Sequence, residues 1–291
     1  MMIRRQTGIA LLQILFLSIV LSTLLLAARY QAQQQLALAF AVKDRTYAEL
    51  ALESAQAELL FQLLTHERQR DSASFNPIMR DWNFHGGPWQ LSDVTIELQD
   101  LNGLAQPGNV ALAEHWFKQQ GINPADAERL GRLLQQTTRA NAAVPMYQLS
   151  SIGVDVNSGR KAPLQLVEEL VNYPGLQNIN LDSFIRAFTT FPTKSINPMT
   201  MPEALMSYYV PGRLTREQVL KLRTENKLDA AKFSQLTGVF NDEAISFYPG
   251  EGVRIVFTAQ HNDVKIRRLI EVKLTPYDHD PYTVWEFRKF Y

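Results

Sequence analysis

Side chains that commonly carry catalysis or bind metal ions are few and scattered in this chain of 291 residues. The chain has no cysteine, which excludes a cysteine nucleophile, a thiolate metal site and a disulfide framework. Its five histidines lack the spacing of metal ligands, and no His-Glu-x-x-His motif occurs. We interpret them as surface or capping residues: His66, His85, His115, His261 and His279.

The acidic residues and the glycines form no catalytic motif either. Glu168-Glu169 and Asp278-x-Asp280 are the most promising acidic pairs, but a solvated helix face and a turn explain them better than acid–base catalysis or calcium binding. No Gly-x-Ser-x-Gly elbow, P-loop or dinucleotide-binding fingerprint is present. The sequence therefore predicts no catalytic, cofactor-binding or metal-binding residues, and we expect a protein that is not an enzyme.

Nucleic-acid binding is also disfavoured, because 29 basic residues are balanced by 29 acidic ones. A turn at Tyr173-Pro174-Gly175-Leu176 resembles the DNA-binding helix-hairpin-helix. However, residues 163–190 around it carry three acids and one base, a net charge of minus two: Glu168, Glu169, Asp182 and Arg186. We interpret this turn as a packing motif, and the more basic stretch 213–232 as a solvated or partner-facing helix.

The N-terminal residues predict chemistry on the main chain instead. Arg4 and Arg5 precede Gly8, and 20 uncharged residues follow, from Ile9 to Ala28. A helix of about 20 residues spans a bilayer, and the two arginines place the N-terminus in the cytoplasm. Cleavage between Gly8 and Ile9 would remove these charges and leave the membrane helix on the product. A secretory signal peptide is disfavoured because the apolar run is long and continues into more helix; an uncleaved signal anchor fits equally well.

Helix-forming residues continue from Ala28 to about Arg68, and neither glycine nor proline occurs between Gly8 and Pro77. Apolar residues recur there at alternating spacings of four and three, which is typical of a helix with one apolar stripe. Two of the nine stripe positions are polar; the nine are Leu36, Phe40, Lys43, Tyr47, Leu50, Ser54, Ala57, Phe61 and Leu64. We expect the stripe to pack against a globular domain or against partner helices. A signal anchor followed by a coiled-coil stalk is the simpler alternative.

A short basic leader that ends in glycine, followed directly by an apolar helix with an amphipathic continuation, resembles a type IV prepilin or a type II secretion pseudopilin. The resemblance implies that a prepilin peptidase cleaves between Gly8 and Ile9, whose new amine is then usually methylated. Most members carry glutamate at the fifth mature position, where this chain has Gln13. In lacking that acid, the chain resembles the minor pseudopilin called general secretion pathway protein K. A tip subunit has no subunit ahead of it whose amine needs neutralising, and an unpaired carboxylate in lipid is costly.

The residues after Pro77 predict strands separated by helices. Strands are expected at 89–98, 252–260, 264–274 and 283–287, and the middle two should form an antiparallel hairpin. Helices are expected at 110–120, from 123 onward, and at 163–171, 181–188, 202–209, 215–224 and 229–236. Thr215 to Gln218 reads as a capping box. The expected fold class is α+β: a pilin-like long N-terminal helix plus a small antiparallel sheet interrupted by a large all-helical insertion.

These patterns divide the chain into four parts. They are a prepilin leader at 1–8, a transmembrane and amphipathic spine helix at 9–70, a pilin-like sheet domain at 84–100 and 246–291, and a helical insertion domain at 101–245. The split sheet resembles that of the K-type pseudopilin, in which a large helical domain interrupts the pilin-like sheet. Local segments at 98–109, 144–176 and 191–200 also resemble that family, and the last of them departs from it at Pro198-Met199. No cofactor is predicted. Calcium is implied by the resemblance alone, and residues 130–138 lack the aspartates that the family often has there.

The resemblance implies a minor pseudopilin that caps the tip of the periplasmic pseudopilus and supports export of folded proteins across the outer membrane. Its partners would be other minor pseudopilins (the I and J kinds), the major pseudopilin, the prepilin peptidase and the inner-membrane secretion platform. A single span would anchor it in the bacterial inner membrane, with the C-terminal head in the periplasm. The alternatives are a type IV pilus minor pilin, an uncleaved signal-anchored periplasmic interaction protein, and a membrane-anchored enzyme.

Overall fold

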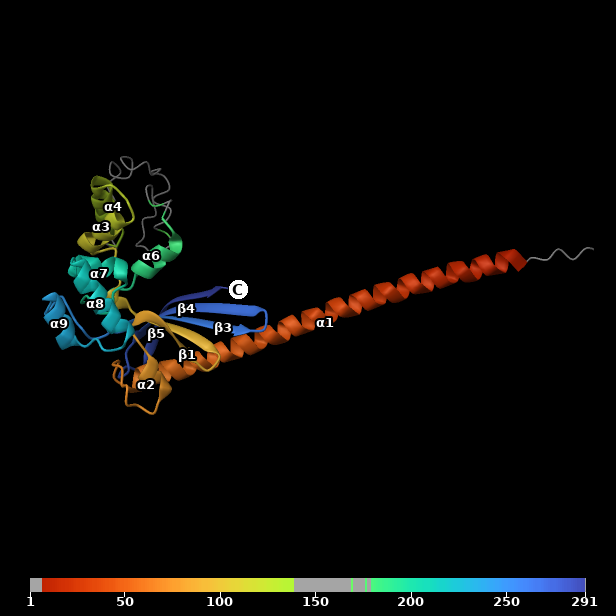
Figure 1. Cartoon of the computed structure of the whole chain (residues 1–291), viewed down its shortest axis with the longest axis horizontal. Helices are drawn as coiled ribbons and strands as arrows, with labels where there is room; N and C mark the ends of the chain where they lie inside the picture. Colours follow the sequence, from red (N-terminus) through yellow and green to blue (C-terminus); the bar gives the residue numbers. More distant parts are fainter. Residues whose placement is uncertain (1–6, 139–168, 170–175, 177–178, 291) are drawn as a thin grey trace, which may run out of the picture.

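A single helix dominates the N-terminal part of the chain. In the computed structural model, which describes residues 7–138, 169, 176 and 179–290, helix α1 runs from Thr7 to Thr65 without interruption. Its 59 residues correspond to about 90 Å at about 1.5 Å per residue. About half of this length projects beyond the head as a rod (Figure 1). The predicted long helix is thus confirmed, and it ends three residues before Arg68.

The head contains one five-stranded antiparallel sheet in the order β1-β2-β3-β4-β5. Its strands are β1 (His85–Leu91), β2 (Val94–Asp100), β3 (Gly252–His261), β4 (Val264–Leu274) and β5 (Tyr282–Phe290). The predicted hairpin of residues 252–274 is confirmed, and the last strand is longer than predicted. The single strand predicted at 89–98 is wrong, because Ser92 turns the chain with φ at 51° and converts the segment into the β1–β2 hairpin.

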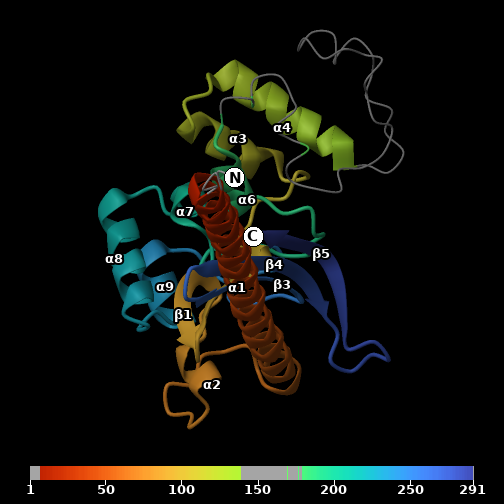
Figure 2. The same cartoon turned by 90° about the vertical axis from the view of Figure 1, so that its right-hand side faces the viewer.

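Helix α1 covers one face of this sheet with its C-terminal half (Figure 2). Alternate residues of β2, β3 and β4 point toward α1, as the two-residue period of a strand requires. The short helix α2 (Pro77–Asp81), capped by Asn76, closes one end of the core with Ile78 and Trp82. From α1 the core receives small and branched side chains: Ala48, Leu52, Ala55, Leu59, Leu60 and Leu63.

Between β2 and β3 the described residues form the short helix η1 (Leu101–Gly103) and six α-helices. They are α3 (Val110–Gln119), α4 (Pro124–Thr138), α6 (Leu181–Ala187), α7 (Glu203–Tyr209), α8 (Arg213–Thr224) and α9 (Ala230–Thr237). Asn109, Asn180 and Asp229 cap the helices that follow them, as such residues commonly do. The capping box predicted at Thr215 is wrong, since α8 begins at Arg213 after Gly212. The helix predicted at 163–171 lies outside the described residues.

The helices have a core of their own, separate from the core under α1. Trp116 of α3 packs edge-on against Phe184 and Phe188, at centroid distances of 5.0 and 5.1 Å. Phe184 and Phe188 stack on each other at 4.6 Å. Aromatic pairs of this geometry add about 0.5–1.5 kcal/mol each beyond the area they bury. A long N-terminal helix on a small antiparallel sheet that is interrupted by helices is the fold class predicted from the sequence, and it is confirmed.

One buried carboxylate joins the sheet to the helical insertion. Asp100 ends β2 and is fully buried, and its two oxygens accept four hydrogen bonds. The main-chain N–H groups of Asn102 and Gly250 donate to one oxygen, each at 3.0 Å; Asn197 (2.8 Å) and Thr200 (3.0 Å) donate to the other. Burial raises the pKa of Asp100, and these four donors oppose that rise. Asp100 therefore holds the insertion at its first residues, at an internal loop and at its end, where the chain enters β3.

Candidate assembly surface

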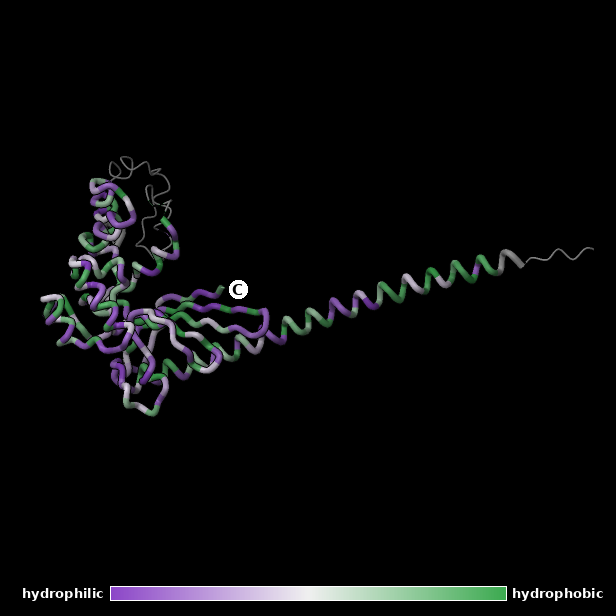
Figure 3. Tube along the Cα trace, in the orientation of Figure 1, coloured by the Kyte–Doolittle hydropathy of each residue, from purple (hydrophilic) through white to green (hydrophobic). Residues whose placement is uncertain are grey.

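The N-terminal part of α1 contacts nothing else in the described chain. Every residue from Leu11 to Lys43 is exposed, although the first 18 or so of them are overwhelmingly apolar (Figure 3). Among the described residues, α1 is the helix long and apolar enough to cross a membrane. A long apolar surface of this kind is stable only in lipid or against other apolar helices.

The predicted processing residues fall at the beginning of this helix. Gly8 and Ile9 lie just inside its first turn, because α1 begins at Thr7. Gln13 lies one turn further on and is exposed. Arg4 and Arg5 lie outside the described residues. Cleavage at Gly8 and the cytoplasmic placement of the leader therefore stay predictions.

Further along, α1 has two apolar faces that point in opposite directions. The face on the sheet contains Ala48, Leu52, Ala55, Leu59 and Leu63, all buried. The predicted stripe lies elsewhere, because residues two positions apart on a helix are turned by about 200°. Leu50 is 58% exposed, whereas Leu52 is 0% exposed. We call the exposed stripe residues the outer stripe; they are Leu36, Phe40, Tyr47, Leu50, Ala57 and Phe61.

The sequence could not assign the stripe to the head or to partners, and the structure separates the two possibilities. Only Leu64, the last predicted stripe residue, is partly buried and packs against the core under α1. The other apolar members remain exposed. The head is held by a second set of residues, which the apolar pattern did not single out because two of its five members are alanines.

Ion pairs at the edges of the buried face fix the rotation of α1. Arg268 of β4, 2% exposed, donates to the Glu53 carboxylate at 2.7 Å and to the Gln56 side-chain oxygen at 2.9 Å. The hydrogen bond from Arg268 lowers the pKa of Glu53, so this pair is ionised at neutral pH. Lys289 of β5 approaches Glu49 at 3.9 Å on the same side. Turning the outer stripe toward the sheet would break these contacts, so its outward orientation is specific.

The opposite face of the sheet is fastened to the insertion by a buried ion pair. Arg254 of β3 and Glu271 of β4 are directly opposed in register, 6% and 0% exposed, and contact each other. Arg254 also donates to the Phe188 carbonyl at 2.8 Å, and Thr189 donates to Glu271 at 3.1 Å. A buried pair whose remaining polar atoms are bonded in this way holds its partners in one geometry. Sequence reasoning did not assign these residues, since alternation alone does not say what covers the second face.

The edge strand β5 presents a second exposed apolar surface. Strand β5 forms the edge of the sheet beyond β4, and α1 lies mainly against β3 and β4, so much of β5 is left exposed. Its exposed aromatic and branched residues lie on both faces of the strand, and one of them, Trp285, packs edge-on against Phe191 of the insertion; the residues are Tyr282, Val284, Trp285, Phe287 and Phe290. Large exposed apolar residues on an edge strand mark a protein-interaction surface more often than a free one.

In the part of the chain that the structure describes, the histidines and acidic residues meet at most in pairs that could not hold a metal ion. Within that part of the chain, no group of three or more histidine, aspartate or glutamate residues could hold a metal ion. Asp278 and Asp280 lie in the exposed turn before β5, where Asp280 approaches His279 at 3.5 Å. Glu168 lies outside the described residues. His85, by contrast, lines a cavity, which is described below.

Comparisons with known proteins give a likeness in structure and none in sequence. No protein-family model matches the sequence, and no curated protein matches it significantly. Among solved structures, a similar chain occurs in the crystal structure of the GspK-GspI-GspJ complex from the type 2 secretion system of enterotoxigenic Escherichia coli. The match covers 91% of this chain and 99% of that chain, with 13% sequence identity and a TM-score of 0.49. At that identity the two chains share few side chains, so no residue's role passes from one to the other.

Proposed function

We propose that this protein is a minor pseudopilin of a type II secretion system, of the K kind. In this proposal it caps the tip of the periplasmic pseudopilus and supports export of folded proteins across the outer membrane. Its partners are the I and J kinds of minor pseudopilin, the major pseudopilin, the prepilin peptidase and the inner-membrane platform. It acts by assembly rather than by catalysis, from a single-span anchor in the inner membrane with its head in the periplasm.

The observation that carries the proposal is the division of α1 into two opposite apolar faces. One face is covered by the head, and the outer stripe lies on the other side of α1, beyond the mostly polar residues 29–35 that follow the membrane segment (Figure 3). A helix that serves only as an anchor and a stalk needs no apolar residues on its free side. A subunit of a helical bundle needs them, because the stripe is buried only when neighbouring helices pack against it.

The proposal implies the following order of assembly steps. Removal of the leader after Gly8 frees the amine of Ile9 and takes away the charges that hold the N-terminus at the cytoplasmic surface. The apolar segment then leaves the bilayer for a bundle of similar helices, exchanging lipid for protein contacts. The head cannot follow into the bundle, since its sheet and insertion are far wider than one helix (Figure 2). In this proposal the wide head prevents further subunits from being added above it, so the subunit lies at the tip of the bundle.

Gln13 fits a position at the tip. A carboxylate there would need a cation within reach in a nonpolar environment, and an unpaired one is costly. A neutral amide imposes no such demand. Gln13 therefore belongs to a subunit that accepts no amine from a neighbour, and Gln13→Glu should impair insertion at the tip rather than improve it.

The test begins with N-terminal sequencing of the protein recovered from membranes of cells that contain a prepilin peptidase. The proposal requires a mature start at Ile9, and Gly8→Leu should abolish this processing. An intact Met1 or a cleavage after Ala28 would contradict it. Loss of the gene should leave exoproteins in the periplasm; loss of surface pili with normal export would identify a type IV pilus minor pilin instead.

Because the chain has no cysteine, single cysteines can map the outer stripe directly. We propose attaching a thiol-specific photocrosslinker to Tyr47→Cys on the stripe and, as the matched control, to Arg45→Cys. The two positions are exposed to nearly the same extent, 52% for Tyr47 and 51% for the Arg45 side chain, and point about 200° apart. Crosslinks to the helices of other pseudopilins are expected from Tyr47→Cys, and an equal yield from Arg45→Cys would count against a stripe-specific interface.

A further inference from the structure

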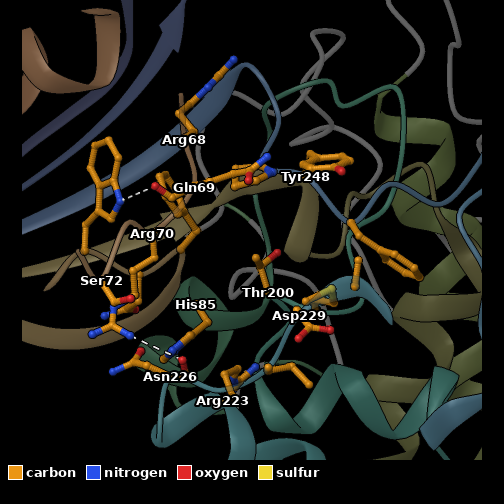
Figure 4. A pocket seen from close by; sticks show the side chains of 18 residues that line it. Arg68, Gln69, Arg70, Ser72, His85, Thr200, Arg223, Asn226, Asp229 and Tyr248 are labelled. Carbon is orange, nitrogen blue, oxygen red and sulfur yellow. Dashed lines mark hydrogen bonds between the residues drawn. The ribbon is translucent and has the colours of Figure 1, made fainter. Parts of the chain in front are cut away.

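A cavity of about 440 Å³ lies where the spine, the sheet and the insertion meet. Its wall combines the residues after α1 (68–72), the approach to β1 (82–85) and parts of the insertion around α8 and α9 (Figure 4). Trp82 and Phe84 belong to this wall and are buried. Arg70, Asn226 and Tyr248 are exposed at its rim, so solvent reaches the interior from that side.

The charged groups that line the cavity are unbalanced. The lining contains three guanidinium groups, of Arg68, Arg70 and Arg223, and one carboxylate, that of Asp229. Asp229 is already engaged, since it accepts a hydrogen bond from the Lys232 main chain at 2.8 Å and pairs with the Lys232 ammonium at 2.7 Å. Arg68 donates to the Gly250 carbonyl and points away from the other two arginines in Figure 4. Because of its orientation Arg68 is set apart, and the two guanidinium groups that lie near each other are those of Arg70 and Arg223.

Main-chain carbonyls orient both of these arginines. Arg70 donates through Nε to the Arg80 carbonyl at 2.6 Å and through Nη1 to the Asn226 carbonyl at 3.4 Å. Arg223 donates through Nη1 to the Met201 carbonyl at 2.6 Å. A carbonyl fixes a guanidinium without neutralising its charge, and within the described residues no carboxylate forms an ion pair with either arginine. Burial lowers the pKa of Arg223 to about 10, while Glu203 opposes the shift from a longer distance, so Arg223 stays charged at neutral pH.

His85 adds an uncharged donor between the two arginines. It lies beside Asn226 and Arg223 at the same end of the cavity as Arg70 (Figure 4). Burial and the Arg223 charge lower the pKa of His85 to about 4, so its ring is neutral at physiological pH and keeps one N–H. The cavity thus offers two cations and one neutral donor.

We propose that this cavity binds an oxyanion group, a carboxylate or a phosphate, between Arg70 and Arg223, with His85 as an additional hydrogen-bond donor. A guanidinium group can donate two parallel hydrogen bonds to two oxygens of a carboxylate or a phosphate. These bonds are strong because both partners are charged. The cavity, at about 440 Å³, is larger than one oxyanion and leaves room for a further group attached to it. No outer-stripe residue lines the cavity, and the inference does not depend on the proposed function.

The group can come from a free small anion or from an acidic side chain of a bound protein segment, and the experiment separates these sources. The full chain in detergent micelles is titrated with sodium phosphate, with acetyl-Glu-Phe-amide and with its neutral analogue acetyl-Gln-Phe-amide, at constant ionic strength in sodium chloride. Binding is followed by the intrinsic tryptophan fluorescence, to which Trp82 in the cavity wall contributes, and by the thermal unfolding midpoint. The variants are Arg70→Gln and Arg223→Gln, with Arg129→Gln as the matched control on an exposed helix surface away from the cavity.

Saturable binding of phosphate or of the glutamyl peptide, weakened at least tenfold in both cavity variants and unchanged in Arg129→Gln, would support the site. Phosphate alone would identify a free anion as the ligand, and preference for the glutamyl over the glutaminyl peptide would identify a protein side chain. Arg70 is exposed, so its variant folds even if Arg223→Gln does not. Binding that is absent in the wild type, or equal in Arg70→Gln and Arg129→Gln, would overturn the proposal.

Discussion

Leu52 and Leu50 of α1 allow the two faces of the helix to be tested with the same substitution. Both are leucines on the same helix, but Leu52 is 0% exposed under the sheet and Leu50 is 58% exposed on the outer stripe. Leu52→Ala removes three buried carbon atoms, worth about 0.8 kcal/mol each. The unfilled cavity adds to that loss, and a total of about 3–5 kcal/mol is typical of fully buried leucines. For Leu50→Ala we expect a change below about 0.5 kcal/mol, because its side chain is largely in solvent.

The assay is urea denaturation of the full chain in detergent micelles, followed by tryptophan fluorescence. Trp82 and Trp89 belong to the core under α1 and report its loss directly. With a denaturant slope of about 2 kcal/mol/M, Leu52→Ala should lower the unfolding midpoint by about 1.5–2.5 M. Leu50→Ala should leave it unchanged.

Function should respond in the opposite order. Leu50→Glu places a charge on the outer stripe, and it should reduce crosslinking to partner helices and export without changing the urea midpoint. If Leu50→Ala destabilised the head as much as Leu52→Ala, the assignment of the two faces would be refuted. If Leu50→Glu assembled and exported normally, the outer stripe would have no part in the bundle.

Three further predictions concern the polar contacts of the head, and urea denaturation checks each of them. Asp100→Ala leaves four buried donors without their acceptor and should cost about 3–5 kcal/mol, whereas exposed Asp93→Ala is the neutral control. Glu271→Gln leaves Arg254 buried without its counter-charge, and it should lower the free energy of unfolding by about 3–5 kcal/mol. An unchanged free energy of unfolding would show that the ion pair does not stabilise the head. Burial and the Glu271 charge raise the pKa of Glu286 to about 7, against 4.5 for the free residue; the folded state then binds the extra proton, so stability should fall as pH rises from about 4.5 to 7. The fall should be about 1–2 kcal/mol, because the Arg288 guanidinium lies against the buried Glu286 carboxylate and offsets part of the shift, and Glu286→Gln should remove it.

The elements that the sequence predicted well are those with a strong local signal. The helix from residue 7 to residue 65 has no glycine or proline to end it, and capping residues such as Asn109 and Asp229 mark the beginnings of α3 and α9. The β1–β2 hairpin was missed because its turn lacks such a local signal. Its turn is Ser92-Asp93, which is not among the dipeptides that favour a positive φ, so the segment looked like one continuous strand.

The sequence could not predict which part of the molecule, or which partner, covers each apolar face. Helix α1 carries two such faces, and periodicity identifies a face without saying whether a sheet or a partner lies against it. Similarly, Arg254 and Glu271 are 17 residues apart, and only the register of β3 on β4 brings them together. The cavity with Arg70 and Arg223 draws on residues even further apart, which no local pattern connects.

Strands β2 and β3 are neighbours in the sheet, yet the chain between them is the whole insertion. The hydrogen bond from Gly250 to Asp100 closes a loop of 150 residues. The entropy lost on closing a loop grows only with the logarithm of its length, but distant pairings form slowly. The β3–β4 hairpin is local, as are the α3–α4 and α7–α8 contacts, and we expect them to form before β2 joins β3.

This order has a consequence during synthesis, which begins at the N-terminus. The buried face of α1 is covered mainly by β3 and β4, which the ribosome reaches last. At about 5–20 residues per second, the 150 residues between Asp100 and Gly250 take about 8–30 s to appear. Throughout that interval the apolar face of α1 and the free edge of β2 have no partner. The new chain is then most prone to aggregate, and a chaperone that holds an apolar helix face would be needed at this stage rather than after the head is complete.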